Sequence, residues 1–312
     1  FFGKDKSLVK RGLDRISYRG KDGEGYFENF GHRLHAVVSN VSQPFKGEGV
    51  LVANCEIYNW EELKIKYNLE ARNDAELLFR LLELKGVSCL DELDGDYAFA
   101  YWRDSKVFLC RDVVGVKPVW YSFGDGFAFA SEKKALEEID YLDIVELNPR
   151  IILEYDVESG KLKESKRSYF EIKENNDSYS GIKEKVSSLL EESIVKRFPN
   201  QKFGILFSGG LDSTLLAYYA KKHGKDFTCY VAGVDEEAED VRYARKVAKD
   251  LKVDLKVVLL SKDKVSNYLE KVVPLIEDNN VVKVGVGLTF FVALEEISKD
   301  GIKVVFSGQG SE

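Results

Sequence analysis

The 312-residue sequence contains no methionine and only five prolines and four cysteines. The cysteines (Cys55, Cys89, Cys110 and Cys229) are scattered and form no Cys-x-x-Cys pair, so they indicate neither a zinc site nor a disulfide framework. This usage favours a reducing, cytoplasmic location. No apolar run reaches the roughly 18–20 residues that a membrane helix requires, and no signal-peptide pattern opens the chain. We therefore expect a soluble protein without a membrane partner.

The sequence also has no excess of basic charge. Its 46 Lys and Arg face 53 Asp and Glu, which gives a net charge of −7. Proteins that bind the phosphate backbone of nucleic acids usually carry a basic balance or stripe, so no nucleic-acid partner is expected. With 44% hydrophobic and 32% charged residues the composition is that of a globular protein, and the length fits two domains better than one.

The lack of methionine is unusual for a chain of this length. The chain opens on Phe1-Phe2-Gly3 without an initiator methionine, and it stops at Glu312, directly after an expected buried strand. From these features we expect that residues are missing at both ends of the sequence.

The first half is rich in strand signals, which are short apolar or alternating runs separated by Gly, Asp and Ser. The expected strands are 33–39, 50–58, 97–102, 107–110, 118–123 and 127–131. Helical stretches are expected at 4–17 and, in two pieces, at 60–86, where Asp74 would begin the second piece. Many strands with few, grouped helices predict an α+β layered domain. We place this domain at 1–165 and a polar linker at 166–181.

From residue 182 onward, strands and helices alternate, which predicts a parallel, doubly wound sheet over 182–312. The expected strands are 202–207, 227–233, 255–260 and 303–307, and the expected helices are 183–197, 212–223, 239–251, 263–273 and 288–299. Ligands of such sheets bind outside the carboxyl ends of the strands. The segments after strands 202–207 and 303–307 should therefore border one crevice.

The strongest local signal is Phe207-Ser208-Gly209-Gly210-Leu211-Asp212-Ser213, in which a buried strand runs into two glycines and then a helix. Glycines let the backbone approach a ligand closely, and a helix start offers unpaired N–H groups to an anion. The two serine hydroxyls add donors, and Asp212 is placed to hold a Mg²⁺ ion that bridges to phosphates. The alternative is an ordinary strand–turn–helix corner with Asp212 as the helix N-cap. No Gly-Lys-[Ser/Thr] follows, so the segment is not a Walker A loop.

The segment 208–213 resembles the pyrophosphate-binding loop of ATP pyrophosphatases, which cleave ATP to AMP and pyrophosphate. Other segments resemble the motifs of class II glutamine amidotransferase domains, in family order: 19–25 (RGKDGEG), 54–59 (NCEIYN), 93–100 (LDGDYAFA), 111–118 (RDVVGVKP) and 129–136 (FASEKKAL). Together the motifs resemble those of the glutamine-hydrolysing asparagine synthetases over nearly the whole chain.

This resemblance implies that the first domain is a four-layer αββα sandwich of the N-terminal-nucleophile (Ntn) hydrolase type, which hydrolyses glutamine to glutamate and ammonia. The implied nucleophile is an N-terminal cysteine whose own α-amine is the base. No such cysteine is present in the sequence. Phe1-Phe2-Gly3 is similar to the segment that follows it in the family.

The resemblance also implies roles for residues further along the first domain. Asn54 would form the oxyanion hole through its amide, and Cys55, which replaces the family's glycine, through its backbone N–H. The residues implied to bind glutamine are Arg33, Glu56 and Asp74. The spacing between His32 and Arg33 is one residue shorter than in the family.

In the second domain the resemblance implies an ATP site and an acceptor site. The implied ATP-binding residues are Leu206, Ser208, Gly209, Gly210, Asp212, Ser213, Ala232, Ser307 and Gly308, with Asp212 as the Mg²⁺ ligand. Segment 307–311 (SGQGS) is similar to the family's Ser-Gly-Glu-Gly segment, and Gln309 stands at the position of a glutamate implicated near the acyl-adenylate. Glutamine cannot carry a negative charge or act as a general base. Residues 283–289 also depart from the family, so the identity of the acceptor stays open.

The implied function is an ATP- and Mg²⁺-dependent ligase that forms an amide with glutamine-derived ammonia. The favoured version converts aspartate to asparagine through an acyl-adenylate and releases AMP and pyrophosphate. Two alternatives remain: a ligase of the same scaffold with another carboxylate acceptor, and a non-catalytic nucleotide- or glutamine-binding relative. The expected partners are glutamine, ATP and a small carboxylate, and a homodimer is left open.

Overall fold

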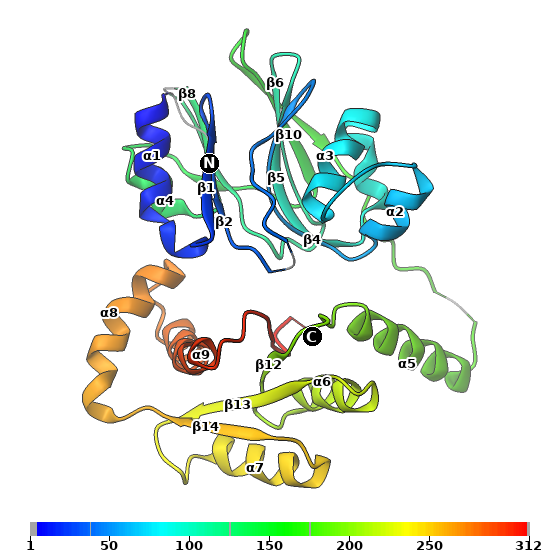
Figure 1. The fold of residues 1–312 in the computed structure, drawn as a ribbon, viewed down its shortest axis with the longest axis vertical. Coiled ribbons are helices and arrows are strands. Elements are labelled where there is room, and N and C mark those ends of the chain that lie inside the picture. Colours follow the sequence, from blue (N-terminus) through cyan, green and yellow to red (C-terminus); the bar gives the residue numbers. More distant parts are fainter. Residues whose placement is uncertain (1–4, 38, 125, 175, 311–312) are drawn as a thin grey trace. The chain divides into compact units, whose positions relative to one another are not determined.

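The computed structural model describes residues 5–37, 39–124, 126–174 and 176–310 (Figure 1). The chain divides into two compact units, Phe1–Lys173 and Glu174–Glu312. Some sequence-based expectations reach residues outside the described ranges: the helix start at Lys4, the strand residue Val38, the segment 1–3 and Ser311.

The first unit contains short helices and many antiparallel strands. Its helices are α1 (Lys6–Arg15), η1 (Ser17–Arg19), α2 (Trp60–Lys66), α3 (Asp74–Lys85), η2 (Gly86–Glu92) and α4 (Lys133–Glu137). Its strands are β1 (Gly23–Phe27), β2 (Phe30–Leu34), β3 (Phe45–Lys46), β4 (Val50–Ile57), β5 (Gly95–Arg103), β6 (Lys106–Arg111), β7 (Trp120–Gly124), β8 (Gly126–Ala130), β9 (Val145–Glu146), β10 (Ile151–Asp156) and β11 (Lys161–Lys166).

These elements form four layers. The largest sheet has the strand order β11-β10-β6-β5-β4-β3, with antiparallel neighbours. Because side chains alternate along a strand, Leu51 of β4 packs toward α2 and α3, whereas Val50 and Val52 pack toward β7 and β8. The outer face of β8 is covered by α1 and α4, through residues such as Leu13 and Leu136 (Figure 1). The predicted α+β, αββα sandwich is confirmed.

Several strand expectations in this unit were wrong or incomplete. The strand expected at 33–39 is β2, which ends at Leu34, and β1, β3, β9, β10 and β11 were not among the expected strands. The sequence of β11 (KLKESK) is polar, and this strand exists because it pairs along its whole length with β10. The first piece of 60–86 ends at Lys66, and the second begins at Asp74, as expected, with Asn73 as its N-cap.

The second unit alternates strands and helices. Its strands are β12 (Phe203–Leu206), β13 (Phe227–Gly233), β14 (Leu255–Leu259) and β15 (Val305–Phe306). Its helices are α5 (Tyr179–Val195), α6 (Leu211–Lys222), α7 (Glu239–Leu251), η3 (Lys262–Lys264), α8 (Val265–Ile276) and α9 (Val281–Lys299).

All pairings of the second unit's sheet are parallel, in the order β14-β13-β12-β15. Apolar residues of α6 and α7 pack on one face of this sheet, for example Ala217 and Ala244. Ile297 of α9 packs on the other face, beside Tyr230 (Figure 1). Helices therefore cover both faces, which confirms the prediction of a doubly wound parallel sheet.

Helix α9 is longer than the sequence suggested, since it begins at Val281 instead of residue 288. Asn280 caps it by accepting hydrogen bonds from the N–H groups of Val282 and Lys283. Its two glycines obscured the helical pattern. One of them, Gly287, allows close packing on α8, because a Cβ there would lie 3.1 Å from a side-chain carbon of Val272. Residues 283–289 are thus helical.

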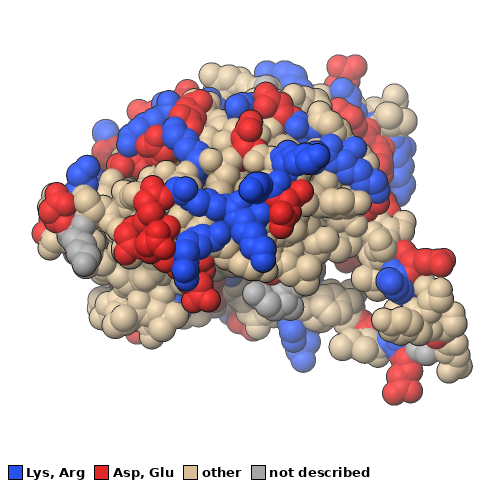
Figure 2. All heavy atoms as spheres, turned by 90° about the horizontal axis from the view of Figure 1, so that it is seen from below, with Lys and Arg blue, Asp and Glu red and all other residues tan. Residues whose placement is uncertain are grey.

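The surface mixes both signs of charge. Figure 2 shows one face on which Lys and Arg side chains gather near the middle while Asp and Glu side chains lie around them. Within the described residues, no helix combines the length and apolar character that crossing a membrane would require.

Candidate functional site

The loop between β12 and α6 has the geometry of an anion-binding turn. Gly209 adopts φ +78°, and a Cβ there would lie 3.2 Å from the Cα of Ala244, so this position requires glycine for both conformation and space. Gly210 is the N-cap of α6, and among the residues that the structure describes no side chain caps this helix start. The backbone N–H groups of the first turn are therefore available to a ligand.

The two predicted serine donors lie next to each other in this loop. The Oγ atoms of Ser208 and Ser213 are 3.4 Å apart, and Ser208 Oγ accepts a hydrogen bond from the N–H of Gly210 at 3.2 Å. Asp212 lies in the first helical turn, half-buried. The alternative in which Asp212 is the N-cap is wrong, because the cap position belongs to Gly210.

The loop after β15 touches the loop after β12. A Cβ on Gly308 would lie only 2.6 Å from the Cβ of Asp212 and 3.2 Å from the backbone nitrogen of Ser213. Only glycine fits at this distance. The parallel register Ile205↔Phe306 explains the contact, because it brings the carboxyl ends of both strands to one edge. The structure thus joins the two segments that the sequence placed at one crevice.

The remaining predicted residues of this unit lie at or near the same edge. Leu206 is the last residue of β12 and Ala232 is the penultimate residue of β13, and both are half-buried. Ser307 and Gln309 are exposed on either side of Gly308. The assignment of these residues to ATP or acceptor binding stays a prediction.

The protein groups at this loop could hold a magnesium ion only if a bound phosphate supplied further oxygen ligands to it. Among the residues that the structure describes, no group of three or more His, Cys, Asp or Glu side chains could enclose a metal ion. Mg²⁺ usually binds through one or two protein carboxylates together with substrate phosphates. The single carboxylate of Asp212, beside a turn suited to phosphate, fits that pattern.

In the first unit, the predicted oxyanion-hole residues lie on β4 where its partner β3 has already ended. The N–H of Ala53 donates to Gln43 Oε1 at 2.8 Å, and the N–H of Ile57 donates to Asp74 Oδ2 at 3.0 Å. Both N–H groups point away from β5. Because backbone directions alternate along an antiparallel strand, the N–H of Cys55 points the same way, between Gln43 and Asp74. It is therefore directed as a backbone oxyanion donor requires.

The side chains at this part of β4 divide between two faces. The thiol of Cys55 packs toward α3, and burial, then the charge of Asp74, raises its pKa well above the ordinary value. Burial also raises the pKa of the Asp74 carboxyl. By the alternation of the strand, Asn54 and Glu56 project to the opposite face from Cys55.

Arg33 is directed elsewhere. Its guanidinium pairs with Asp14 of α1 at 2.6 Å and with Glu24 of β1 at 2.7 Å. The preceding residue, His32, faces β4, with Nε2 3.1 Å from the carbonyl oxygen of Ala53. Burial lowers the pKa of His32 to about 4, so its ring is neutral. Since neighbouring residues of a strand face opposite sides, Arg33 projects away from β4 while His32 faces it.

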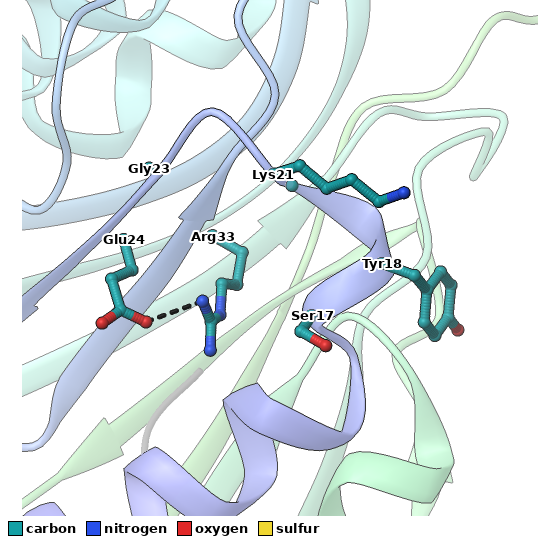
Figure 3. Close-up of a pocket in the computed structure, with 7 residues that line it drawn as sticks. Ser17, Tyr18, Lys21, Gly23, Glu24 and Arg33 are labelled. Carbon is teal, nitrogen blue, oxygen red and sulfur yellow. Dashed lines mark ion pairs between the residues drawn. The ribbon is translucent and has the colours of Figure 1, made fainter. Parts of the chain in front are cut away.

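Arg33 lines a pocket of about 530 Å³ together with Ser17, Tyr18, Gly20, Lys21, Gly23 and Glu24. Figure 3 shows that Arg33 and Glu24 point toward each other, whereas Lys21 points away from them. In this arrangement the positive charge of Arg33 is compensated by two carboxylates. The structure therefore groups Asn54, Glu56, Asp74 and the Cys55 backbone around β4, and does not join Arg33 to them.

Two residues that support this site were not recognised from the sequence. Gln43 is 7% exposed and forms two hydrogen bonds with the backbone of Ala53, and His32 contacts the same carbonyl. Both hold the residue that precedes Asn54. The sequence offered little sign of these contacts, because they join residues that lie far apart in the chain. The one sign was a glutamine in a segment without a clear hydrophobic pattern.

Comparison with known proteins agrees with this division. The glutamine amidotransferase domain model matches residues 2–176, and the asparagine synthase model matches residues 185–312. The chain thus consists of a glutamine amidotransferase domain followed by an asparagine synthase domain.

Individual curated relatives are named asparagine synthetase [glutamine-hydrolyzing], in agreement with these two domain models. The chain is 35% identical to "Putative asparagine synthetase [glutamine-hydrolyzing] 1" of Methanocaldococcus jannaschii, over 95% of this chain and 63% of the relative. It is 28% identical to the asparagine synthetase [glutamine-hydrolyzing] of Zea mays, over 96% of this chain and 55% of the relative. Among solved structures, the glutamine phosphoribosylpyrophosphate amidotransferase of B. subtilis covers 74% of this chain and 65% of its own, with a TM-score of 0.47 and 17% identity.

The chain belongs to the family of glutamine-hydrolysing asparagine synthetases. It spans somewhat more than half the length of the curated relatives cited here.

Proposed function

We propose that this protein is an ATP-dependent ligase that forms an amide with ammonia taken from glutamine, and that it converts aspartate to asparagine. In this proposal the carboxylate is activated as an acyl-adenylate, and AMP and pyrophosphate are released. The observation that carries the proposal is the contact between the Ser208–Ser213 loop and Gly308. It brings a phosphate-type turn and a second loop to the carboxyl edge of one parallel sheet, where ligands of such folds bind.

In the ligase unit, the free N–H groups at the start of α6 and the hydroxyls of Ser208 and Ser213 bind the pyrophosphate part of ATP. Asp212 is the protein ligand for Mg²⁺, which offsets phosphate charge when bound. Leu206 and Ala232 lie beside the adenosine, and Ser307 lies on the opposite loop. Gln309 can orient the acyl group through its amide N–H but cannot take up a proton.

In the amidotransferase unit, the Asn54 amide and the Cys55 N–H stabilise the oxyanion formed when the glutamine amide is attacked. Glu56 and Asp74 bind the α-ammonium group of glutamine. Arg33 binds the α-carboxylate only after it has separated from Asp14 and Glu24, to which it is paired in this structure.

The proposal is tested by measuring pyrophosphate release from ATP and Mg²⁺ with aspartate, supplied with either ammonia or glutamine. Asp212→Ala should abolish release with both nitrogen sources, because the metal ligand is lost. Asp240→Ala is a matched control, since Asp240 is also an acid in the first turn of a helix of this unit, α7. Unchanged release by Asp212→Ala would refute the mechanism.

A second candidate is a ligase of the same scaffold with a different acceptor, favoured by Gln309 and by the helical segment 283–289. A screen of carboxylic acids in the same assay separates the two. If aspartate fails to stimulate pyrophosphate release while another acid does, the asparagine assignment is wrong.

A further inference from the structure

The loop between β12 and α6 rests against helix α7. A Cβ on Gly209 would lie 3.1 Å from the ring atom Cδ1 of Tyr243 and 3.2 Å from the carbonyl oxygen of the same residue. It would lie equally close, at 3.2 Å, to the Cα of Ala244. Gly209 therefore approaches both the backbone and the aromatic ring of α7, and the loop cannot shift toward this helix unless Tyr243 moves.

Other contacts restrain the same loop from within. The hydroxyl of Thr214 donates to the carbonyl oxygen of Gly209 at 3.0 Å, and Ser208 Oγ accepts a hydrogen bond from the N–H of Gly210 at 3.2 Å. These groups belong to the loop itself and to α6, which directly follows it. Their bonds fix the local shape of the loop, whereas the contact with Tyr243 fixes its position against a separate helix.

The core does not require a large aromatic residue at position 243. Helix α7 is anchored by Val241, Ala244 and Ala248, which are 0%, 0% and 3% exposed. Tyr243 lies off this face and is 52% exposed, and the described part of the chain offers its hydroxyl no hydrogen-bond partner. Outward positions of a surface helix are usually polar or charged. The contact with Gly209 is therefore the interaction that explains an aromatic ring at this position.

The position of Gly209 decides where the anion-binding groups of the loop point. The uncapped N–H groups at the start of α6 and the hydroxyls of Ser208 and Ser213 all lie next to it. A turn of this kind binds an anion well only when its N–H groups converge on one place. A displacement of about 1 Å at such a site can cost about 100-fold in rate. A side chain that fixes Gly209 therefore controls how well the loop binds a diphosphate group.

We propose that Tyr243 is a positioning residue of the nucleotide site, whose ring backs Gly209 and keeps the loop in the shape that binds the pyrophosphate part of ATP. Tyr243 acts through Gly209 and touches neither the phosphates nor the metal ion. This inference rests on the proposed function of the loop. It adds to the site a residue of α7, a helix that contains neither the motif at 208–213 nor the segment at 307–310.

The test measures the binding of inorganic pyrophosphate with Mg²⁺ by calorimetry and the KM for ATP in the pyrophosphate-release assay. Tyr243→Ala should weaken pyrophosphate binding and raise the KM for ATP by about 10-fold, because the loop loses its support. Tyr243→Phe should bind as tightly as the unaltered protein, because it keeps the ring. The KM for aspartate and the Tm should change little in both variants, since the ring is half-exposed. Tyr218→Ala, at a tyrosine of α6 that is 47% exposed, is the matched control.

Gly209→Ala tests whether Tyr243 acts through the loop. The added Cβ would press against the ring and the backbone of α7, so this variant should also bind pyrophosphate weakly. The losses caused by Gly209→Ala and Tyr243→Ala should be less than additive in the double variant, because both changes disturb one contact.

Three results would overturn the inference. They are unchanged pyrophosphate binding by folded Tyr243→Ala, a Tyr243→Phe variant that binds as weakly as Tyr243→Ala, and strictly additive losses in the double variant. Absence of pyrophosphate binding by the unaltered protein would also overturn it. A protein that binds pyrophosphate in the expected way but does not turn over ATP would instead refute the ligase proposal and leave the Tyr243 result intact.

Discussion

Replacing Gly308 by alanine tests the geometry of the proposed ATP site without altering any polar group. The added Cβ would lie 2.6 Å from the Cβ of Asp212, whereas ordinary contacts of this kind begin near 3.4 Å. The two loops must therefore separate by about 1 Å. A misplacement of that size around reacting groups can cost about 100-fold in rate, or about 2.7 kcal/mol in the barrier.

We expect Gly308→Ala to lower kcat/KM for ATP by about 100-fold in the pyrophosphate-release assay. The contact lies in a partly exposed loop, so the overall fold should persist, and a thermal melt followed by circular dichroism should show a small decrease in Tm. Gly124→Ala is the control, because a Cβ on Gly124 would meet no atom of the described part of the chain within 4 Å. Activity of Gly308→Ala within about threefold of the unaltered protein would show that the loop contact does not define the site.

Two further predictions concern titrating groups of the first unit. Because the pKa of the Cys55 thiol is raised, iodoacetamide at pH 7.5 should label Cys55 more slowly than it labels glutathione, as measured by mass spectrometry. Asp74→Asn should speed the labelling of Cys55. Fast labelling of the unaltered protein would contradict the raised pKa. The pKa of Glu92 is lowered to about 2, first by Lys66 and then by Lys85, so its stabilisation is present above the unfolded value of 4.5 and is lost as the pH falls toward 2. The urea midpoints of Glu92→Gln and the unaltered protein should therefore differ most above pH 4.5 and converge as the pH falls toward 2, and a constant difference would refute the assignment.

Much of the second unit could be predicted because local pattern and final structure agree there. The expected boundaries of β13 and α7 match the structure to the residue. Apolar strands buried on both faces, acids at helix starts and glycines at turns are signals carried by the sequence itself. For the same reason, the sequence correctly predicted that the loop at 208–213 and the segment at 307–310 lie at one edge of the second unit's sheet.

The rest depended on contacts between residues far apart in the chain. Gln43 and His32 both contact Ala53, and neither has a pattern that announces this contact. The direction of Arg33 is fixed by its ion pairs with Asp14 and Glu24, which lie on other elements and have no local signal in the sequence. The hydrogen bonds of Arg111 and Asp112 could not be predicted from the RDVVGVKP motif, because their partners include Tyr97 of β5 and Leu147, which follows β9.

The pairing of β15 with β12 has a consequence for the order in which the protein is made. The loop at 208–213 leaves the ribosome well before Gly308, and β15 contributes only two paired residues, Val305 and Phe306. Domains tend to fold from the N-terminus during synthesis. The proposed nucleotide site therefore stays incomplete until β15 has been made, and a nascent protein that already contains α6 and α7 still lacks one wall of it.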